Sequence, residues 1–189
     1  FVNEVFPHYG QFSPGSLLLA ACFFTVQIYC DFYSYSLMAK GSAKVLGIDL
    51  MDNFKEPLFS KSIVEFWRRW HISLSGWFRD YLYIPLGGNR KGTVRHLVNI
   101  LIVFAVSGLW HGAAGTFVLW GMIHGFFNAL EVAIKKRRGK RESSNFLVNG
   151  IKRFYTFAVV VFAFVFFRAD TTSQGLGIIG KIFTGNGGG

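Results

Sequence analysis

Four long apolar stretches alternate with polar segments along the chain, at about residues 16–38, 96–110, 116–134 and 151–167. An α-helix of about 20 residues crosses the roughly 30 Å hydrocarbon core of a bilayer. The pattern therefore predicts an all-α, polytopic integral membrane protein with about four transmembrane helices, the second of them short. Residues 171–184 are expected to form a short surface helix.

A segment with no clean span, residues 40–95, separates the first two stretches. Helical spacing over residues 60–78 places large apolar side chains on one face: Ile63, Phe66, Trp67, Trp70, Leu74, Trp77 and Phe78. The other face carries charge, from Lys61, Glu65, Arg68 and Arg69. We expect one amphipathic or re-entrant helix with Ser60 as its N-cap, lying along the membrane or packed beneath it. The glycines of residues 87–92 indicate a turn.

Composition and charge support the membrane assignment. The chain is 51% hydrophobic with 22 Phe, which is unusual for a soluble domain of 189 residues. Its net charge of +10 is segregated, because ten of the 20 Lys and Arg lie in residues 40–95 and eight in residues 135–153. Four spans place these two segments on one side, which the positive-inside rule makes cytoplasmic. The basic excess thus needs no nucleic-acid partner.

Three side chains in apolar surroundings are candidates for chemistry. His71 lies at the edge of the amphipathic face, and His111 lies beside Gly112 at a break between apolar stretches. A histidine can give and take a proton near neutral pH, although a core histidine bonded to a backbone carbonyl fits the same spacing. Asp31 lies inside the first stretch, where we expect it to hydrogen-bond neighbouring Tyr hydroxyls rather than to act in catalysis.

Two long motifs resemble the membrane-bound O-acyltransferases. They are FWRRWHISLSGWFRDYLYIPLGGNRKG at residues 66–92 and SGLWHGAAGTFVLWGMIHG at residues 107–125. Within that family they are most similar to the bacterial alginate O-acetylation branch, with the D-alanyl transfer protein of teichoic acid synthesis a more distant relative. An upstream stretch, YCDFYSYSLMAKGSAKVLGIDLMDNFKEP, is also similar, but it departs at Tyr33 and Leu37, where that branch more usually has Gly and Asp.

The resemblance implies an enzyme of the bacterial inner membrane. It would move an acetyl group from a cytoplasmic thioester such as acetyl-CoA to a hydroxyl acceptor, in O-acetylation of an alginate-like exopolysaccharide. Residues 1–189 would form a single acyltransferase domain, as a C-terminal fragment of a longer protein, with a catalytic core at residues 57–134. Expected partners are membrane lipids, the acyl donor, and a periplasmic acetylation protein or polysaccharide. No bound cofactor is expected.

The same resemblance assigns roles to single residues. His111 matches the invariant histidine of the family and suits a general base, and His71 matches the second functional position. Supporting positions are Trp67, Trp70, Trp110, Gly112 and His124. The donor-binding residues are expected from the charge of the segment and not from the resemblance: guanidinium groups pair well with phosphate, so the phosphates of the donor would meet the basic face, at Arg68, Arg69, Arg79, Arg90 and Lys91. Contact with anionic lipid explains these five basic residues equally well.

Three other interpretations of these residues are a metal site, a transporter or channel, and a structural membrane scaffold. A metal site is not expected, because the spacings of 40 and 13 residues between His71, His111 and His124 fit no standard ligand pattern. A transporter or channel could use Asp31 and His111 as relay groups. A structural membrane scaffold would use the Trp and Gly residues for helix packing alone.

Overall fold

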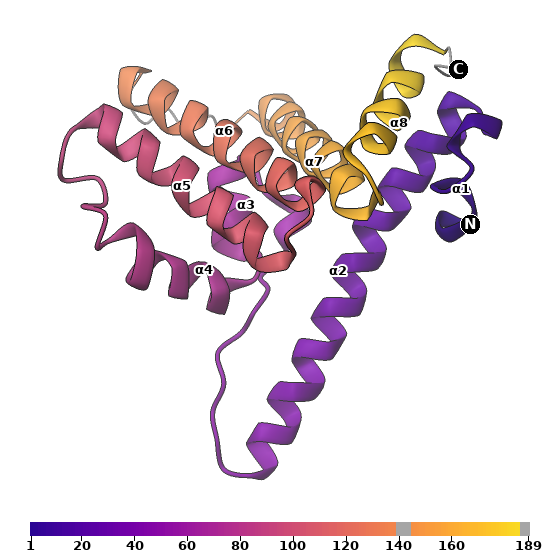
Figure 1. Ribbon diagram of the computed structural model, residues 1–189. Helices are drawn as coiled ribbons and strands as arrows, with labels where there is room; N and C mark the ends of the chain where they lie inside the picture. Colours follow the sequence, from indigo (N-terminus) through magenta and orange to yellow (C-terminus); the bar gives the residue numbers. More distant parts are fainter. Residues whose placement is uncertain (139–144, 186–189) are drawn as a thin grey trace.

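Helices joined by loops make up the computed structural model, which describes residues 1–138 and 145–185 (Figure 1). The elements are α1 (Val2–Val5), α2 (Pro14–Val45), α3 (Ile63–Arg69), α4 (Ile72–Phe78), α5 (Thr93–His111), α6 (Gly115–Arg138), α7 (Phe146–Arg168) and α8 (Thr172–Thr184). Short 3-10 turns cover Tyr9–Gln11 and Pro57–Phe59, and a π-helical turn covers Arg79–Tyr83. Helices α2, α5, α6 and α7 are long and apolar enough to cross a membrane, which confirms the four predicted spans.

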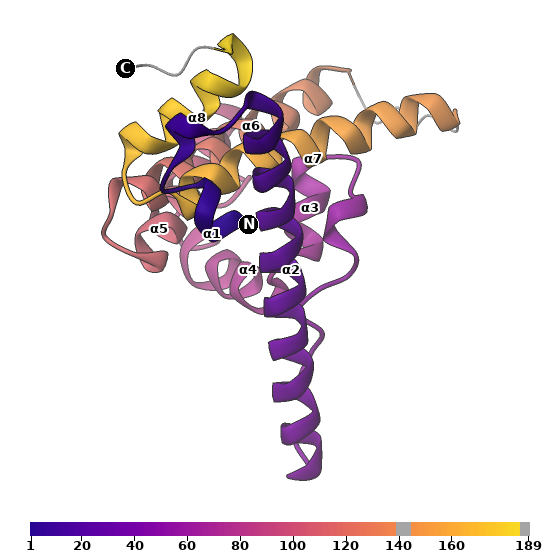
Figure 2. The same ribbon diagram turned by 90° about the vertical axis from the view of Figure 1, so that its right-hand side faces the viewer.

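Helix α2 is longer than the predicted span and begins at Ser13, whose side chain accepts a hydrogen bond from the Ser16 amide at 3.2 Å. Its N-terminal half packs against α7 and α8, and its C-terminal half extends away from the other helices (Figures 1 and 2). The following loop, residues 46–56, returns to α3. Salt bridges Lys40–Asp52 and Lys44–Asp49, each 2.5 Å long, tie this loop to the last turns of α2.

Helices α5 and α6 form a closely packed antiparallel pair. A Cβ atom on Gly108 would overlap the carbonyl of Phe117, and one on Gly121 would overlap the carbonyl of Phe104. Glycine at both positions therefore lets the two backbones touch. At the other end of the pair, the Lys136 side chain donates a hydrogen bond to the Thr93 hydroxyl.

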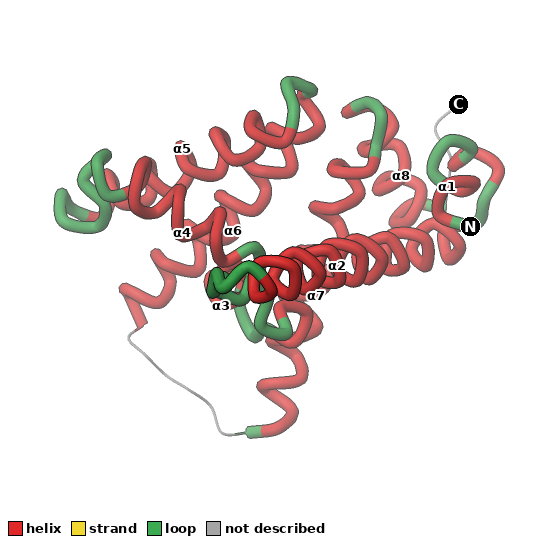
Figure 3. Tube along the Cα trace, turned by 90° about the horizontal axis from the view of Figure 1, so that it is seen from below, coloured by secondary structure: helices red, strands yellow, loops and turns green. Residues whose placement is uncertain are grey.

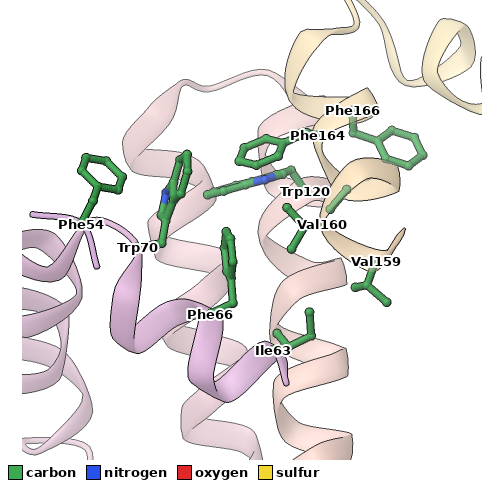
Figure 4. Close-up of a cluster of buried hydrophobic side chains, with 10 residues drawn as sticks. Phe54, Ile63, Phe66, Trp70, Trp120, Val159, Val160, Phe164 and Phe166 are labelled. Carbon is green, nitrogen blue, oxygen red and sulfur yellow. The ribbon is translucent and has the colours of Figure 1, made fainter. Parts of the chain in front are cut away.

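An aromatic core holds α3 against this pair and α7. Phe66 and Trp70 of α3 stack with ring centroids 5.4 Å apart, and Trp70 lies 5.5 Å from Phe164 of α7. Trp120 of α6 stacks beside Phe164, with ring centroids 6.3 Å apart (Figure 4). The predicted apolar face is thus largely confirmed, because Ile63, Phe66, Trp70 and Phe78 are buried and Trp67 and Leu74 half-buried. Trp77 instead is 53% exposed.

The prediction of one continuous helix over residues 60–78 is wrong. The helix stops at Arg69, Trp70 is extended, and His71 has a left-handed backbone with φ 45° and ψ 55° before α4 begins. The two short helices leave this break as separate elements (Figure 3). Ser62 rather than Ser60 caps α3, with its hydroxyl accepting from the Glu65 amide at 3.0 Å. Ser60 is buried at the end of the preceding 3-10 turn.

A carboxylate from α6 also fixes the beginning of α3. The oxygens of Glu131 accept hydrogen bonds from the amides of Ile63 and Val64, at 2.9 and 3.1 Å. These amides belong to the first turn, where no carbonyl of the same helix is available to them. Glu131 therefore joins α3 to α6 through two charge-assisted hydrogen bonds.

Replacing Glu131 with Ala should lower the free energy of unfolding by roughly 1.5–3 kcal/mol, the size expected when a charged hydrogen-bond acceptor is lost. Thermal unfolding of the full-length protein in detergent measures this change. Asp49→Ala is the matched control, since it removes an exposed carboxylate of a surface salt bridge worth about 1 kcal/mol or less. Equal stability of the two variants would contradict the role given to Glu131.

Candidate active site

His71 occupies the break between α3 and α4. The left-handed backbone turns its ring toward α2 and α5, where it packs against Phe32 at a centroid distance of 4.7 Å and Trp110 at 6.5 Å. Its Nδ1 lies 3.3 Å from Oδ1 of Asn53. The helix break thus directs the imidazole of His71 toward the end of α5. In a continuous helix the ring would point in another direction.

His111 is the last residue of α5, and Gly112, with φ 160°, ends the helix in an extended conformation. The imidazole packs against Trp110 at 5.0 Å, Trp120 at 5.1 Å and Phe167 of α7 at 5.3 Å. Trp110 therefore contacts both His71 and His111. The structure brings the two predicted catalytic histidines to one place.

The protonation of His71 follows from its surroundings. Burial lowers the pKa of His71 to about 4, and the nearby His111 adds to that lowering. A buried imidazole is easier to keep neutral than charged. His71 is therefore a neutral imidazole at physiological pH, and such a group accepts a proton at its free nitrogen.

A cavity of about 850 Å³ runs along α4 beside this pair, walled by α3, α5 and α6. Its lining includes Ser73, next to His71, and Ser107, one turn before His111. Cavities of roughly 300–1,000 Å³ are the usual size for small-molecule sites. Neither histidine lines the cavity itself, but the Ser73 hydroxyl on its wall is 3.5 Å from Nδ1 of His71. The arrangement therefore leaves space for a ligand close to His71.

The five predicted donor-binding residues separate into two groups. Arg68 and Arg79 line the cavity, although Arg79 also pairs with Asp80 at 2.8 and 3.1 Å. Arg69 pairs with Glu65 at 2.7 Å on the polar side of α3. Arg90 and Lys91 are exposed in the glycine-rich turn and do not line the cavity. Glycines 87, 88 and 92 all have positive φ there, which confirms the predicted turn.

The other predicted supporting residues lie around the pair in different ways. Trp67 and Trp70 belong to the aromatic core, whereas Trp110 is 59% exposed. His124 is fully buried among Phe66, Trp67 and Trp120, and neither of its ring nitrogens has a hydrogen-bond partner among the described residues. It lies one turn beyond Trp120, whose ring contacts both His124 and His111, so His124 belongs to the aromatic packing next to the site.

The expected hydrogen bonds from Asp31 to tyrosine hydroxyls are not found among the described residues. Asp31 is exposed on α2, where its carbonyl accepts a hydrogen bond from the Ser34 hydroxyl at 3.0 Å. Its side chain lines a smaller cavity on that helix with Gln27 and Tyr35. A helix accommodates an exposed carboxylate only where water or polar headgroups reach it.

Sequence reasoning missed two residues at the site. Trp120 packs against both His111 and His124, and Asn53 bonds to His71. Asn53 lies within the upstream stretch already noted as similar to the family, but nothing in its own context marks it. Trp120 and Trp110 belong to different helices, because the chain turns between them. Helical spacing along the sequence therefore could not indicate that both contact His111.

A comparison with protein families matches residues 12–167 to the model described as MBOAT, membrane-bound O-acyltransferase family. The chain belongs to the membrane-bound O-acyltransferases. This membership confirms the resemblance carried by the two motifs around His71 and His111, and it agrees with a multi-pass membrane protein.

Several curated members of the membrane-bound O-acyltransferase family are similar to this chain. Probable alginate O-acetylase AlgI of Pseudomonas fluorescens is 45% identical over 170 residues, 90% of this chain and 33% of that protein. Peptidoglycan O-acetyltransferase of Helicobacter pylori is 38% identical over 156 residues, 82% of this chain and 29% of that protein. Teichoic acid D-alanyltransferase of Bacillus subtilis is 32% identical over 108 residues, 53% and 27% respectively. The chain spans about a third of the length of these relatives.

In this membrane-bound O-acyltransferase, the ring of His71 should titrate with a midpoint near pH 4, well below the ordinary pKa of 6.5. NMR of the full-length protein with labelled histidines, in detergent, measures the midpoint. His111→Gln should move the pKa of His71 upward, because His111 contributes to its lowering. A midpoint at or above 6.5 would contradict the burial of His71.

Proposed function

We propose that the chain carries the acyl-transfer site of an O-acetyltransferase of the bacterial inner membrane. The enzyme moves an acetyl group from a cytoplasmic thioester, with acetyl-CoA as the donor, to a hydroxyl group of an alginate-like exopolysaccharide or of a periplasmic protein that acetylates it. The pairing of His71 and His111 on Trp110 carries the proposal. The names of the alginate and peptidoglycan relatives support acetyl as the acyl group.

The chemistry needs a base at the acceptor hydroxyl. His111 takes the hydroxyl proton while the oxygen attacks the thioester carbonyl carbon, which forms the C–O bond. The C–S bond then breaks, and the imidazolium returns the proton to the leaving thiolate. The acetyl group is never bound covalently to the enzyme, so the step is a direct transfer. His71 is neutral and also packs against Trp110, and it accepts a hydrogen bond from a neighbouring hydroxyl of the acceptor, which orients the acceptor.

The cavity along α4 is where we place the donor. It passes from Arg79 and Asp80 at one end of α4 to Ser73 at the other, beside His71. A thioester arm lying along α4 would put its carbonyl near the histidines and its phosphates near Arg68 and Arg79. Guanidinium groups suit phosphates because they donate two parallel hydrogen bonds.

The orientation of the chain follows from the basic residues. Segments 40–95 and 135–153 would face the cytoplasm, where acyl thioesters are available. The Lys136–Thr93 hydrogen bond is consistent with this orientation, since it joins one end of each segment. His111, at the opposite end of α5 from Thr93, would then lie toward the acceptor side. His71 belongs to segment 40–95 and would reach His111 because α3 and α4 re-enter the membrane from the cytoplasmic side.

Replacing His111 with Ala in the full-length enzyme should lower turnover by about 10²-fold or more, because the base acts in the transition state. The Michaelis constant for acetyl-CoA should change little. Transfer of labelled acetyl from acetyl-CoA to isolated cell-surface polysaccharide measures both, in membranes of a deletion strain carrying each variant. His8→Ala, an exposed histidine on the N-terminal segment, is the matched control. Near-normal transfer by His111→Ala would overturn the assignment of the base.

Arg68→Ala and Arg79→Ala should raise the Michaelis constant for acetyl-CoA more than they lower turnover, because they remove contacts made equally before and during the reaction. Arg153→Ala removes an exposed arginine of the basic side that does not line the cavity, and it serves as the control. If all three variants bind acetyl-CoA as the wild type does, the cavity arginines contact lipid only.

A further inference from the structure

Three polar atoms surround the side-chain oxygen of Asn53. It accepts hydrogen bonds from the Ser73 amide at 3.1 Å and the Ser73 hydroxyl at 2.8 Å, and Nδ1 of His71 lies 3.3 Å from it. The Ser73 amide is a donor only, so it identifies this atom as the carbonyl oxygen of the Asn53 amide. The Asn53 nitrogen correspondingly faces the hydroxyl of Ser36, at 3.4 Å.

These contacts determine which nitrogen of His71 carries the proton. The single hydroxyl proton of Ser73 is directed at Asn53, so Ser73 has none to give to Nδ1 of His71, 3.5 Å away. An unprotonated Nδ1 would face the carbonyl oxygen of Asn53 lone pair to lone pair. The proton of the neutral ring therefore lies on Nδ1, and Nε2 keeps its lone pair.

The backbone of the same loop holds the helix break around His71. The carbonyl of Asn53 accepts from the Ile72 amide at 3.0 Å, and the Lys55 amide donates to the carbonyl of Arg69 at 2.9 Å. One loop thus bonds to the chain on both sides of the left-handed residue. A non-glycine residue in that conformation needs such surroundings, because the backbone alone disfavours it by roughly 1–2 kcal/mol.

We propose that Asn53 is the positioning residue of His71, holding the proton on Nδ1 so that Nε2 can accept a hydrogen bond from a hydroxyl of the acceptor next to the one that His111 deprotonates. The inference rests on the proposed acyl transfer. It adds Asn53 to the site as a residue that does not touch the substrate. Asn53 acts only through His71. The other side chains around the ring, Phe32 of α2, Trp110 of α5 and Ser73 of α4, carry no charge, and His111 is the titratable group that acts on it.

Two substitutions separate positioning from support of the fold. Asn53→Ala should lower turnover by about tenfold with little change in the Michaelis constant for acetyl-CoA. A tenfold change corresponds to about 1.4 kcal/mol, the size of one hydrogen bond. Asn53→Asp keeps an oxygen that accepts from Nδ1, so it should restore turnover wherever His71 is neutral, at neutral and alkaline pH. It should also move the acid limb of the pH profile upward by about one unit, because a carboxylate stabilises the imidazolium.

Ser36→Ala is the matched control, since it removes the other contact of the Asn53 side chain and leaves His71 untouched. Its turnover should stay within about twofold of the wild type. The inference is overturned if Asn53→Ala, present at wild-type level in the membrane, keeps wild-type turnover. It is also overturned if Asn53→Asp and Asn53→Ala fall equally at every pH, which is the result of a purely structural role.

The titration of His71 gives a readout that does not depend on turnover. NMR of the full-length protein should show the midpoint of His71 rising in Asn53→Asp and unchanged in Ser36→Ala. If the wild type transfers no acetyl group, the proposed function fails, and this midpoint alone decides the positioning role. An unchanged midpoint in Asn53→Asp would then overturn it, and a raised midpoint would support it.

Discussion

Gly108 and Gly121 lie against each other where α5 and α6 pack, and neither position has room for a side chain. Without a hydrophobic force between helices in lipid, close van der Waals contact is a main source of their association. Only residues 112–114 join the two helices. This contact therefore determines the relative positions of His111, the last residue of α5, and Trp120, in the second turn of α6. The aromatic core joins α3 and α7 to this pair of helices. Phe164 of α7 packs against both Trp70, at the end of α3, and Trp120 of α6.

The four long helices could be predicted because a single property decides them. Apolar side chains over a membrane-length stretch are stable only in lipid or in a core, whatever lies elsewhere in the chain. The break at His71 could not be predicted in this way, since apolar side chains recur at helical spacing on both sides of it. Two backbone hydrogen bonds hold the break: the Asn53 carbonyl accepts from the Ile72 amide, and the Lys55 amide donates to the Arg69 carbonyl. Both partners lie more than ten residues away in the sequence. Histidine is enriched among residues with a left-handed backbone, but such residues are uncommon, so the identity of residue 71 alone does not mark the position.

The candidate site was also only partly predictable from the sequence. His111 could be found because its glycine neighbours mark the end of a helix. His71 could be found because it lies within the motif of residues 66–92. Which arginines line the cavity could not be found, because every basic residue of residues 40–95 satisfies the charge asymmetry equally. Arg68 and Arg69 are neighbours, yet one faces the cavity and the other pairs with Glu65. That choice depends on the direction in which the short helix α3 leaves its cap at Ser62, and on Glu131 of α6.

The length of α2 has a mechanical consequence for the site. Its 32 residues measure about 48 Å, well beyond the roughly 30 Å of hydrocarbon in a bilayer. Such a helix must tilt or project, and the amount depends on membrane thickness. Its last turns are fastened by Lys40 and Lys44 to the loop that bonds to both sides of His71. A change of lipid composition that altered the tilt of α2 would therefore act on the loop around His71, although α2 contributes no catalytic group.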